Sequence, residues 1–503
     1  MREADQAPDP DEPTEARSAG PALLALALAM LMASLGTSIA NVALPTLATA
    51  LGGSFQTVQW VVLAYLLAVT TLIVSVGRLG DLIGRRRLLI AGIATFTIAS
   101  VACAAAPTLP ALIASRAVQG LGAAILMALA LAFVAAAVPR ARIAGAIGLL
   151  GTMSAVGTAL GPSLGGLLID GLGWRSIFLV NLPLGLAALV LARRHLPADR
   201  SAVAERQRFD QLGTVLLATA LAAYVLAVTI GDGGFGPLNL GLLLAAAAGA
   251  AAFVASQRRS RSPLLRLGLL RDRRLSIGLA TSALVSTVMM ATLVVGPFYL
   301  SRALGLGAAS VGIVMTVGPA VAAVTALPAG RLADRIGAER IVVLGLAAAA
   351  VGALALALLP RQLAVAGYLA PMVLLTAGYA AFQTANNAAV MADLPTDRRG
   401  LVAAMLNLSR NLGLVTGASV MGAVFALAAG TSDVGSARPE DVATGMHTTF
   451  FVATALIAIA LLLASAQLRR SRPATEAVQP AGRAFRPGSI PRLSLDGARS
   501  RNQ

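Results

Sequence analysis

Two arginines lie inside long apolar stretches of this 503-residue chain. Arg116 lies within the stretch 110–137, Arg410 lies some ten residues from the cytoplasmic end of its stretch, and no Asp or Glu lies well inside any of these stretches. A guanidinium in apolar surroundings must face other protein groups and find acceptors. The chemistry open to it is to bind an anion, or to hold helices together through backbone carbonyls.

The sequence offers little for catalysis. Cys103, the only cysteine, lies in an apolar stretch, so an intrachain disulfide or a cysteine metal site is excluded. No spacing of His, Asp and Glu indicates a metal centre or an acid–base pair, and no glycine-rich loop carries the Gly-Lys-Ser/Thr of a nucleotide site. We therefore expect no enzyme, no metal and no cofactor.

The elements that position the two arginines are apolar stretches long enough to cross a membrane. Hydrophobic residues make up 57% of the chain and charged residues 12%, against roughly 25% charged in soluble domains. Reading segments that cover about 30 Å at 1.5 Å per residue predicts fourteen helical spans. They are 21–47, 56–76, 88–106, 110–137, 143–169, 174–194, 211–230, 238–256, 275–301, 308–330, 341–359, 362–390, 400–429 and 447–468.

The placement of arginine predicts the orientation of these spans. The chain has 39 Lys plus Arg, all of them arginine, and a net charge of +17. Arginines cluster in the loops after even-numbered spans, as cytoplasmic loops require, and this explains the charge without a nucleic-acid partner. We expect both termini in the cytoplasm, with residues 1–20 a disordered acidic tail rather than a signal peptide and 469–503 a disordered basic tail. The Ala-, Gly- and Arg-rich composition indicates a bacterial cell membrane.

An internal repeat divides the chain. Gly77, Asp81 and Gly84 recur 253 residues later as Gly330, Asp334 and Gly337. Gly157, Gly161 and Gly166 recur 256 residues later as Gly413, Gly417 and Gly422. We predict an all-α membrane protein with six-helix bundles at 21–194 and 275–468 and two inserted helices at 211–256. Repeated halves favour a carrier that rocks around a midplane site.

At this point the chain resembles the major facilitator superfamily, specifically its fourteen-helix drug:proton antiporter branch. The resemblance rests on five local patterns: Gly77-x-Leu79-x-Asp81-x-x-Gly84-Arg85-Arg86; Arg116-x-x-Gln119-Gly120-x-Gly122; Gly157-x-x-x-Gly161-Pro162-x-x-Gly165-Gly166; Trp174-Arg175-x-x-Phe178-x-x-Asn181-x-Pro183-x-Gly185; and the segment from Asn407 to Gly413.

The resemblance implies roles for these residues. The loop between spans 2 and 3 and its repeat would form a conformational latch: Gly77, Asp81, Gly84, Arg85, Arg86, Gly330, Asp334 and Gly337. The motifs of spans 4 and 5 would serve coupling and gating: Arg116, Gln119, Gly120, Gly157, Gly161, Pro162, Gly165 and Gly166. Glycines at four-residue spacing also let two helix backbones approach closely, whatever the family.

Span 1 departs from the pattern of this branch. The segment Leu35 to Pro45 matches its helix-1 motif, except that Gly36 replaces the usual aspartate. A cavity carboxylate is the usual proton carrier, so the remaining titratable candidates are Asp170, Asp81 and His447. Each has the alternative of a purely interfacial role.

A set of polar side chains is expected to line the substrate cavity, each with the alternative of serving as an interhelical hydrogen bond. The set is Asn41, Tyr65, Gln119, Gln383, Asn386, Asn387, Asn407 and Arg410, with Met153, Phe298 and Tyr299 as apolar wall. Two arginines without intramembrane carboxylates predict anionic or neutral amphiphilic substrates rather than lipophilic cations.

The function predicted is a secondary active exporter of small amphiphilic compounds such as drugs, antibiotics or metabolites, driven by the proton gradient through alternating access. We expect a monomer in the lipid bilayer. The alternatives are an uncoupled facilitator, or a membrane sensor or scaffold that keeps the fold.

Overall fold

The computed structural model describes residues 12–137, 143–197, 210–230, 236–260, 267–358, 360–392, 396–430 and 437–471. Every regular element in these ranges is helical. Fourteen helices, some with a short break, are long and apolar enough to span a membrane. The all-α class and the number of spans predicted from the sequence are therefore confirmed.

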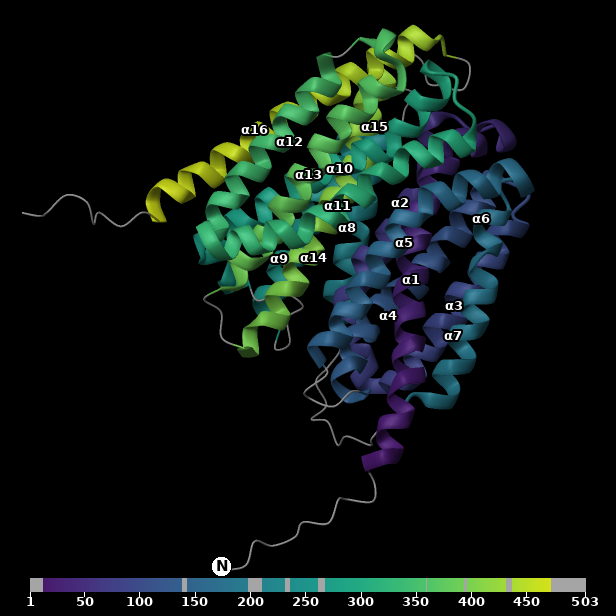
Figure 1. Cartoon of the computed structure of the whole chain (residues 1–503), viewed down its shortest axis with the longest axis vertical. Helices are drawn as coiled ribbons and strands as arrows, with labels where there is room; N and C mark the ends of the chain where they lie inside the picture. Colours follow the sequence, from purple (N-terminus) through teal and green to yellow (C-terminus); the bar gives the residue numbers. More distant parts are fainter. Residues whose placement is uncertain are drawn as a thin grey trace, which may run out of the picture.

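The helices of the N-terminal bundle pack mainly among themselves. They are α1 (Glu12–Leu51), α2 (Phe55–Ile83), α3 (Arg85–Ala105), α4 (Leu109–Ala137), α5 (Ile143–Leu172), the short α6 (Ser176–Leu179) and α7 (Asn181–His195). The C-terminal bundle repeats this arrangement (Figure 1). Its elements are α10 (Arg273–Phe298), η3 (Tyr299–Ala303), α11 (Ala308–Ile336), α12 (Ala338–Leu358), η4 (Arg361–Leu363), α13 (Ala364–Met391), α14 (Thr396–Thr416), η5 (Gly417–Met421), α15 (Gly422–Ala428) and α16 (Pro439–Ser471).

Two helices lie between the bundles in sequence, α8 (Gln211–Thr229) and α9 (Pro237–Arg259), and η2 (Leu267–Arg271) follows them. They pair with each other, and Gln257 Nε2 donates to the buried Asp210 carboxylate, 2.7 Å away, at the start of α8. Helix α8 contacts both bundles: the hydroxyls of Thr214 and Ser75 on α2 are 2.8 Å apart, and Leu412 of α14 packs against its apolar cluster. The hairpin thus covers the junction of α2 with α14.

The two bundles use their repeated glycines in the same way. A Cβ on Gly157 would lie 2.7 Å from the Leu31 oxygen of α1, and one on Gly413 would lie 2.3 Å from the Ala283 oxygen of α10. The same glycines accept matching hydrogen bonds at 3.1 Å, from Ser38 to Gly157 O and from Thr287 to Gly413 O. Because a side chain would separate the helices, these contacts explain why glycine recurs there.

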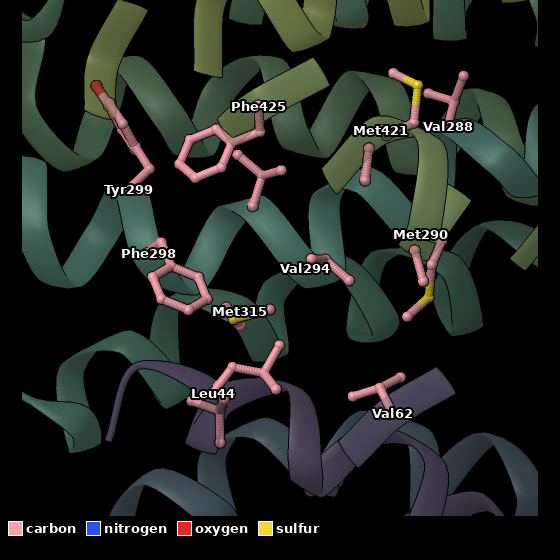
Figure 2. Close-up of a cluster of buried hydrophobic side chains, with 14 of the residues drawn as sticks. Leu44, Val62, Val288, Met290, Val294, Phe298, Tyr299, Met315, Met421 and Phe425 are labelled. Atoms are coloured by element: carbon pink, nitrogen blue, oxygen red, sulfur yellow. The ribbon is translucent and has the colours of Figure 1, made fainter. Parts of the chain in front are cut away.

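The bundles join at one end through an apolar plug and separate toward the end where α1 begins (Figure 1). Figure 2 shows Leu44 and Val62 opposite side chains of the C-terminal bundle. The ring of Phe55 lies 4.8 Å from that of Phe298 and 5.0 Å from that of Phe425. We define the apolar plug by the residues Leu44, Phe55, Val62, Val288, Met290, Val294, Phe298, Met315, Met421 and Phe425, all buried.

The outside of the bundles carries many large apolar side chains. Leu172, Val324 and Leu462 are 76%, 76% and 69% exposed. A soluble protein rarely leaves so much apolar surface uncovered, and a lipid bilayer is the solvent that suits it.

At its start, α1 differs from the expectation for the N-terminal tail. The helix begins at Glu12, within the segment 1–20 expected to be disordered. Acidic residues are favoured in the first turn of a helix because of its positive dipole end. Residues 1–11 and 472–503, which hold most of the two predicted tails, lie outside the described part of the chain.

Candidate functional site

Arg116 is completely buried at the centre of the N-terminal bundle, where it joins three helices. Its Nε donates to the Val61 carbonyl oxygen of α2 at 2.9 Å, and one Nη donates to the Gly36 carbonyl oxygen of α1 at 3.1 Å. Its other Nη donates to Gln119 Oε1, one turn along α4. The guanidinium thus has acceptors on every side.

Aromatic rings complete the surroundings of Arg116. Its guanidinium carbon lies 4.2 Å from the ring centroid of Tyr65, whose hydroxyl donates to the Ala33 oxygen at 2.8 Å. Gln119 in turn donates to the Ser100 hydroxyl of α3 at 2.7 Å. A Cβ on Gly120 would lie 2.6 Å from the Tyr65 backbone oxygen, so this glycine lets α4 approach α2. One network thus ties α4 to its neighbours, and four of its residues were predicted from the sequence: Arg116, Gln119, Gly120 and Tyr65.

Gly36 contributes to this network through its backbone. Its carbonyl oxygen is one of the Arg116 acceptors, and a Cβ here would lie 3.0 Å from Phe96 Cζ and 3.4 Å from the Tyr65 hydroxyl oxygen. The place of the expected carboxylate is therefore taken by an aromatic ring, and backbone carbonyls serve as the acceptors of the arginine.

Two predicted cavity residues bond within a bundle. Asn41 is buried and donates to the Thr37 oxygen of its own helix at 3.1 Å. Asn386 is buried and donates to the Gly278 oxygen of α10 at 3.1 Å. Asn386 also lines a small pocket with Arg274 and Glu339, which form an ion pair at 2.9 Å. The Asn386 hydrogen bond joins two helices, whereas Asn41 donates only within α1 and its Oδ1 has no partner among the described residues.

Arg410 has surroundings unlike those of Arg116. It is half-buried on α14, and its Nε is inaccessible to solvent and has no hydrogen-bond partner. Tyr379 of α13 is close enough to interact with it electrostatically. On α13, Gln383 Nε2 donates to Asn387 Oδ1 at 3.3 Å, and Gln383 Oε1 has no partner. Asn407, one turn from Arg410, is exposed.

The glycines of α5 make two kinds of contact, one with α1 of the same bundle and one with α11 of the other bundle. Gly161 and Gly165 face α1, where a Cβ would meet Ser38 and Val42. Gly166 faces the other bundle: its Cβ would lie 2.4 Å from the Ala308 oxygen of α11. Pro162, which bends a helix by removing a donor, has its carbonyl oxygen 2.2 Å from the Cβ position of Gly312 on α11. This part of the motif therefore lies on the seam between the bundles.

Asp170 also lies on this seam. Its carboxylate accepts a hydrogen bond from the Ala309 backbone N–H at 3.0 Å, at the first turn of α11. The sequence identified the carboxylate but not its partner, because a backbone N–H has no sequence signal. His447, the candidate at the predicted start of span 14, is half-buried in α16.

The latch repeat shows the same backbone turn twice. Gly84 and Gly337 end α2 and α11 with φ of 98° and 96°, a region that glycine alone enters without strain. Gly330 lies in α11, and Asp334 is exposed there. An Nη of Arg86 donates to the Arg193 carbonyl oxygen at the end of α7. The surroundings of Gly77 and the side chain of Asp81 lie outside the described part of the structure, and Arg85 is exposed.

The apolar plug is the feature that the sequence analysis missed, except for Phe298. Its residues are ordinary hydrophobic residues of spans 1, 2, 9, 10 and 13, so no residue type distinguishes them. Gln59 of α2, which touches the Cβ position of Gly422, was also missed. The repeat itself was the available signal, because Gly166 and Gly422 are equivalent positions and both face the opposite bundle.

Residues 26–418 match the Major Facilitator Superfamily. The chain is 35% identical over 407 residues to multidrug resistance protein Stp of Mycobacterium tuberculosis, covering 80% of this chain and 75% of that protein. It is 32% identical over 414 residues to multidrug efflux pump LfrA of Mycolicibacterium smegmatis, covering 80% of each.

The fold is similar to that of a solved bacterial homologue of the human lysosomal transporter Spinster. The TM-score is 0.65 at 17% identity, covering 91% of this chain and 99% of the other. With the matching segment extending over most of the chain and fourteen helices fit to span a membrane, this is a multi-pass bacterial membrane protein that belongs to the Major Facilitator Superfamily of transporters.

Proposed function

We propose that the protein is a secondary active exporter of small amphiphilic compounds, driven by the proton gradient through alternating access. It works as a monomer in the cell membrane with both termini in the cytoplasm, and it needs no cofactor. The similarity to the two mycobacterial drug-resistance proteins supports export of drug-like compounds.

The observation that carries this proposal is the closure of one end by side chains of both bundles. The apolar plug and the contacts of α5 with α11 join the bundles at the end where α1 and α5 finish. The arginine-rich loops predict that this end faces outward. The structure then corresponds to the state that loads substrate from the cytoplasm, and opening of the plug would release it outside.

The proposed route of coupling uses a group other than a helix-1 carboxylate. Asp170 is the candidate with a contact across the seam, since its carboxylate holds the first turn of α11. Protonation would remove the charge that this N–H and the helix dipole favour, and so weaken closure of the outer end. Asp81 and His447 are the other candidates.

The test is transport into inverted membrane vesicles with and without an imposed proton gradient, for a panel of neutral, anionic and cationic amphiphiles. We expect accumulation that a protonophore abolishes. Equal movement without the gradient would favour the uncoupled facilitator, and no movement at all would favour the sensor or scaffold.

A matched pair of α5 variants tests alternating access itself. Gly166→Ala places a Cβ against the Ala308 backbone oxygen and should prevent closure of the seam, whereas Gly171→Ala has no atom within 4 Å of its new Cβ. We expect transport to fall severely in the first variant and to stay near wild type in the second. Equal transport by both variants would contradict a role for this seam.

A further inference from the structure

The two arginines of the spans differ in what their charge can still bind. Arg116 uses its donors on the Val61, Gly36 and Gln119 oxygens and has no exposed surface. Arg410 makes no hydrogen bond or ion pair with any residue that the structure describes, and part of its side chain is accessible. An unpaired guanidinium in a membrane-embedded bundle requires an acceptor, and the described protein groups supply none.

The helix beside Arg410 presents a polar stripe, which we define as Tyr379, Gln383 and Asn387 of α13. Residues four apart share a helix face, and all three are half-buried while their neighbours Phe382, Ala385 and Asn386 are buried. Tyr379 is the member that interacts electrostatically with Arg410. The stripe therefore adjoins the guanidinium with a hydroxyl and two amides.

The stripe also contains an unused acceptor. Gln383 donates to Asn387, but its own Oε1 is solvent-inaccessible and has no hydrogen-bond partner among the described residues. Two buried polar atoms without partners, Arg410 Nε and Gln383 Oε1, lie on adjoining helices. Buried polar atoms are nearly always paired, and these two therefore leave polar groups of adjoining helices without described protein partners beside the accessible part of Arg410.

The charge balance decides the sign of that ligand. The carboxylates of the described helices lie near helix ends, as Asp170, Asp334, Glu339 and Glu440 do. The stripe carries no carboxylate, and neither do the turns of α14 next to Arg410, so a cationic group beside the stripe would meet the Arg410 charge without an offset from these segments. One guanidinium balances one negative charge, and its planar fork matches the two oxygens of a carboxylate.

We propose that Arg410 and the polar stripe bind the carboxylate of a monoanionic amphiphile. The guanidinium holds the two carboxylate oxygens, the Tyr379 hydroxyl beside it donates to one of their remaining lone pairs, and the Asn387 amide, two turns farther along the stripe, is left for a polar group of the substrate. This deepens the proposed function, on which it rests for its transport arm, by naming the substrate class.

Binding to the purified full-length protein tests the site without relying on transport. The probes are 1-pyrenebutyrate, which carries the carboxylate, and 1-pyrenebutanol, its neutral analogue. We expect Arg410→Gln to weaken binding of pyrenebutyrate by on the order of tenfold, the usual effect of one charge-assisted contact, and to leave pyrenebutanol within about twofold. Arg410→Lys should retain part of the affinity, because it keeps the charge without the fork.

The control is Arg438→Gln, which removes an arginine whose side chain is 79% exposed and pairs with Asp441 far from the stripe. It should bind both probes as wild type does. Equal loss of both probes in Arg410→Gln, or no loss of either, would overturn the proposal. Failure of wild type to prefer pyrenebutyrate over pyrenebutanol would also overturn it.

Uptake of the same probes into inverted vesicles separates the two proposals. Selective loss of pyrenebutyrate transport in Arg410→Gln supports both. If wild type binds pyrenebutyrate through Arg410 but moves neither probe, the site is supported and the exporter is wrong. If pyrenebutanol is transported and the carboxylate is neither bound nor moved, the exporter is supported and the anion site is wrong.

Discussion

The N-terminal and C-terminal bundles are built on the same glycine contacts, yet each holds its arginine differently. Arg116 is enclosed by carbonyls of α1 and α2 and fixes the N-terminal bundle, whereas Arg410 stands beside a polar stripe with donors to spare. The comparison teaches that the charge of a residue inside a membrane bundle can be satisfied in two ways. One uses the protein's own backbone, and the other leaves the acceptor to be supplied by a ligand.

The largest effect is expected from removing the enclosed arginine. Arg116→Ala leaves the Val61, Gly36 and Gln119 oxygens without their donor and opens a cavity between the three helices that it joins, so we expect a loss of about 3 kcal/mol in the free energy of unfolding. Unfolding of the purified protein in a detergent titration measures it. Unchanged stability with transport alone lost would show that Arg116 acts on substrate or coupling, and the comparison would fail.

Matched glycine variants of the two bundles should give the next effect. Gly157→Ala and Gly413→Ala each place a Cβ against a backbone oxygen, at 2.7 and 2.3 Å, so both should destabilise by about 1–3 kcal/mol. The shorter distance predicts the larger cost for Gly413→Ala. Thermal unfolding of both variants checks this, with Gly171→Ala as the control. The reverse order would mean that the helices of the C-terminal bundle move apart at a lower free-energy cost than those of the N-terminal bundle.

A smaller effect is expected at the seam. Asp170→Ala removes one exposed, charge-assisted hydrogen bond to the first turn of α11, a contact of about 0.5–1 kcal/mol. The outer end should open more often, by a factor of about two to five. Labelling of a cysteine introduced at plug residue Val62, in a Cys103→Ser background, measures the accessibility. Asp170→Asn should lie between wild type and Asp170→Ala, because its amide oxygen still accepts.

The smallest effect on stability is expected from Arg410. Arg410→Gln removes no hydrogen bond or ion pair that the described residues make, so the free energy of unfolding should change by less than about 0.5 kcal/mol. The same detergent titration used for Arg116→Ala measures it. A loss comparable to that of Arg116→Ala would show that Arg410 is also a packing residue.

The fold could be predicted from the sequence because its signals are local. Apolar length gives the fourteen spans, and the repeats at Gly157 and Gly413 give two bundles with the same close helix contact. The break of span 6 into α6 and α7 was not predicted, since Val180 and Asn181 have no breaking signal of their own.

The candidate site was harder, because its decisive partners are not side chains. Arg116 was identified, but its acceptors are mostly backbone oxygens, which every residue carries. Asn386 looks the same in sequence as Asn387, yet Asn386 bonds to the neighbouring helix α10 and Asn387 lies on the stripe. Which face a polar residue occupies depends on the neighbouring helices and cannot be read from its identity.

Because of the inserted hairpin, a compound dissolved in the lipid meets a different surface on each side of the molecule. Helix α8 lies over the junction of α2 with α14, held by Thr214 and Leu412, while no described inserted helix lies over the junction of α5 with α11. A hydrophobic compound in the lipid therefore meets an inserted helix on one flank and the bundle helices α5 and α11 themselves on the other. The two flanks thus face the bilayer with different helices, a property that two six-helix bundles alone would not have.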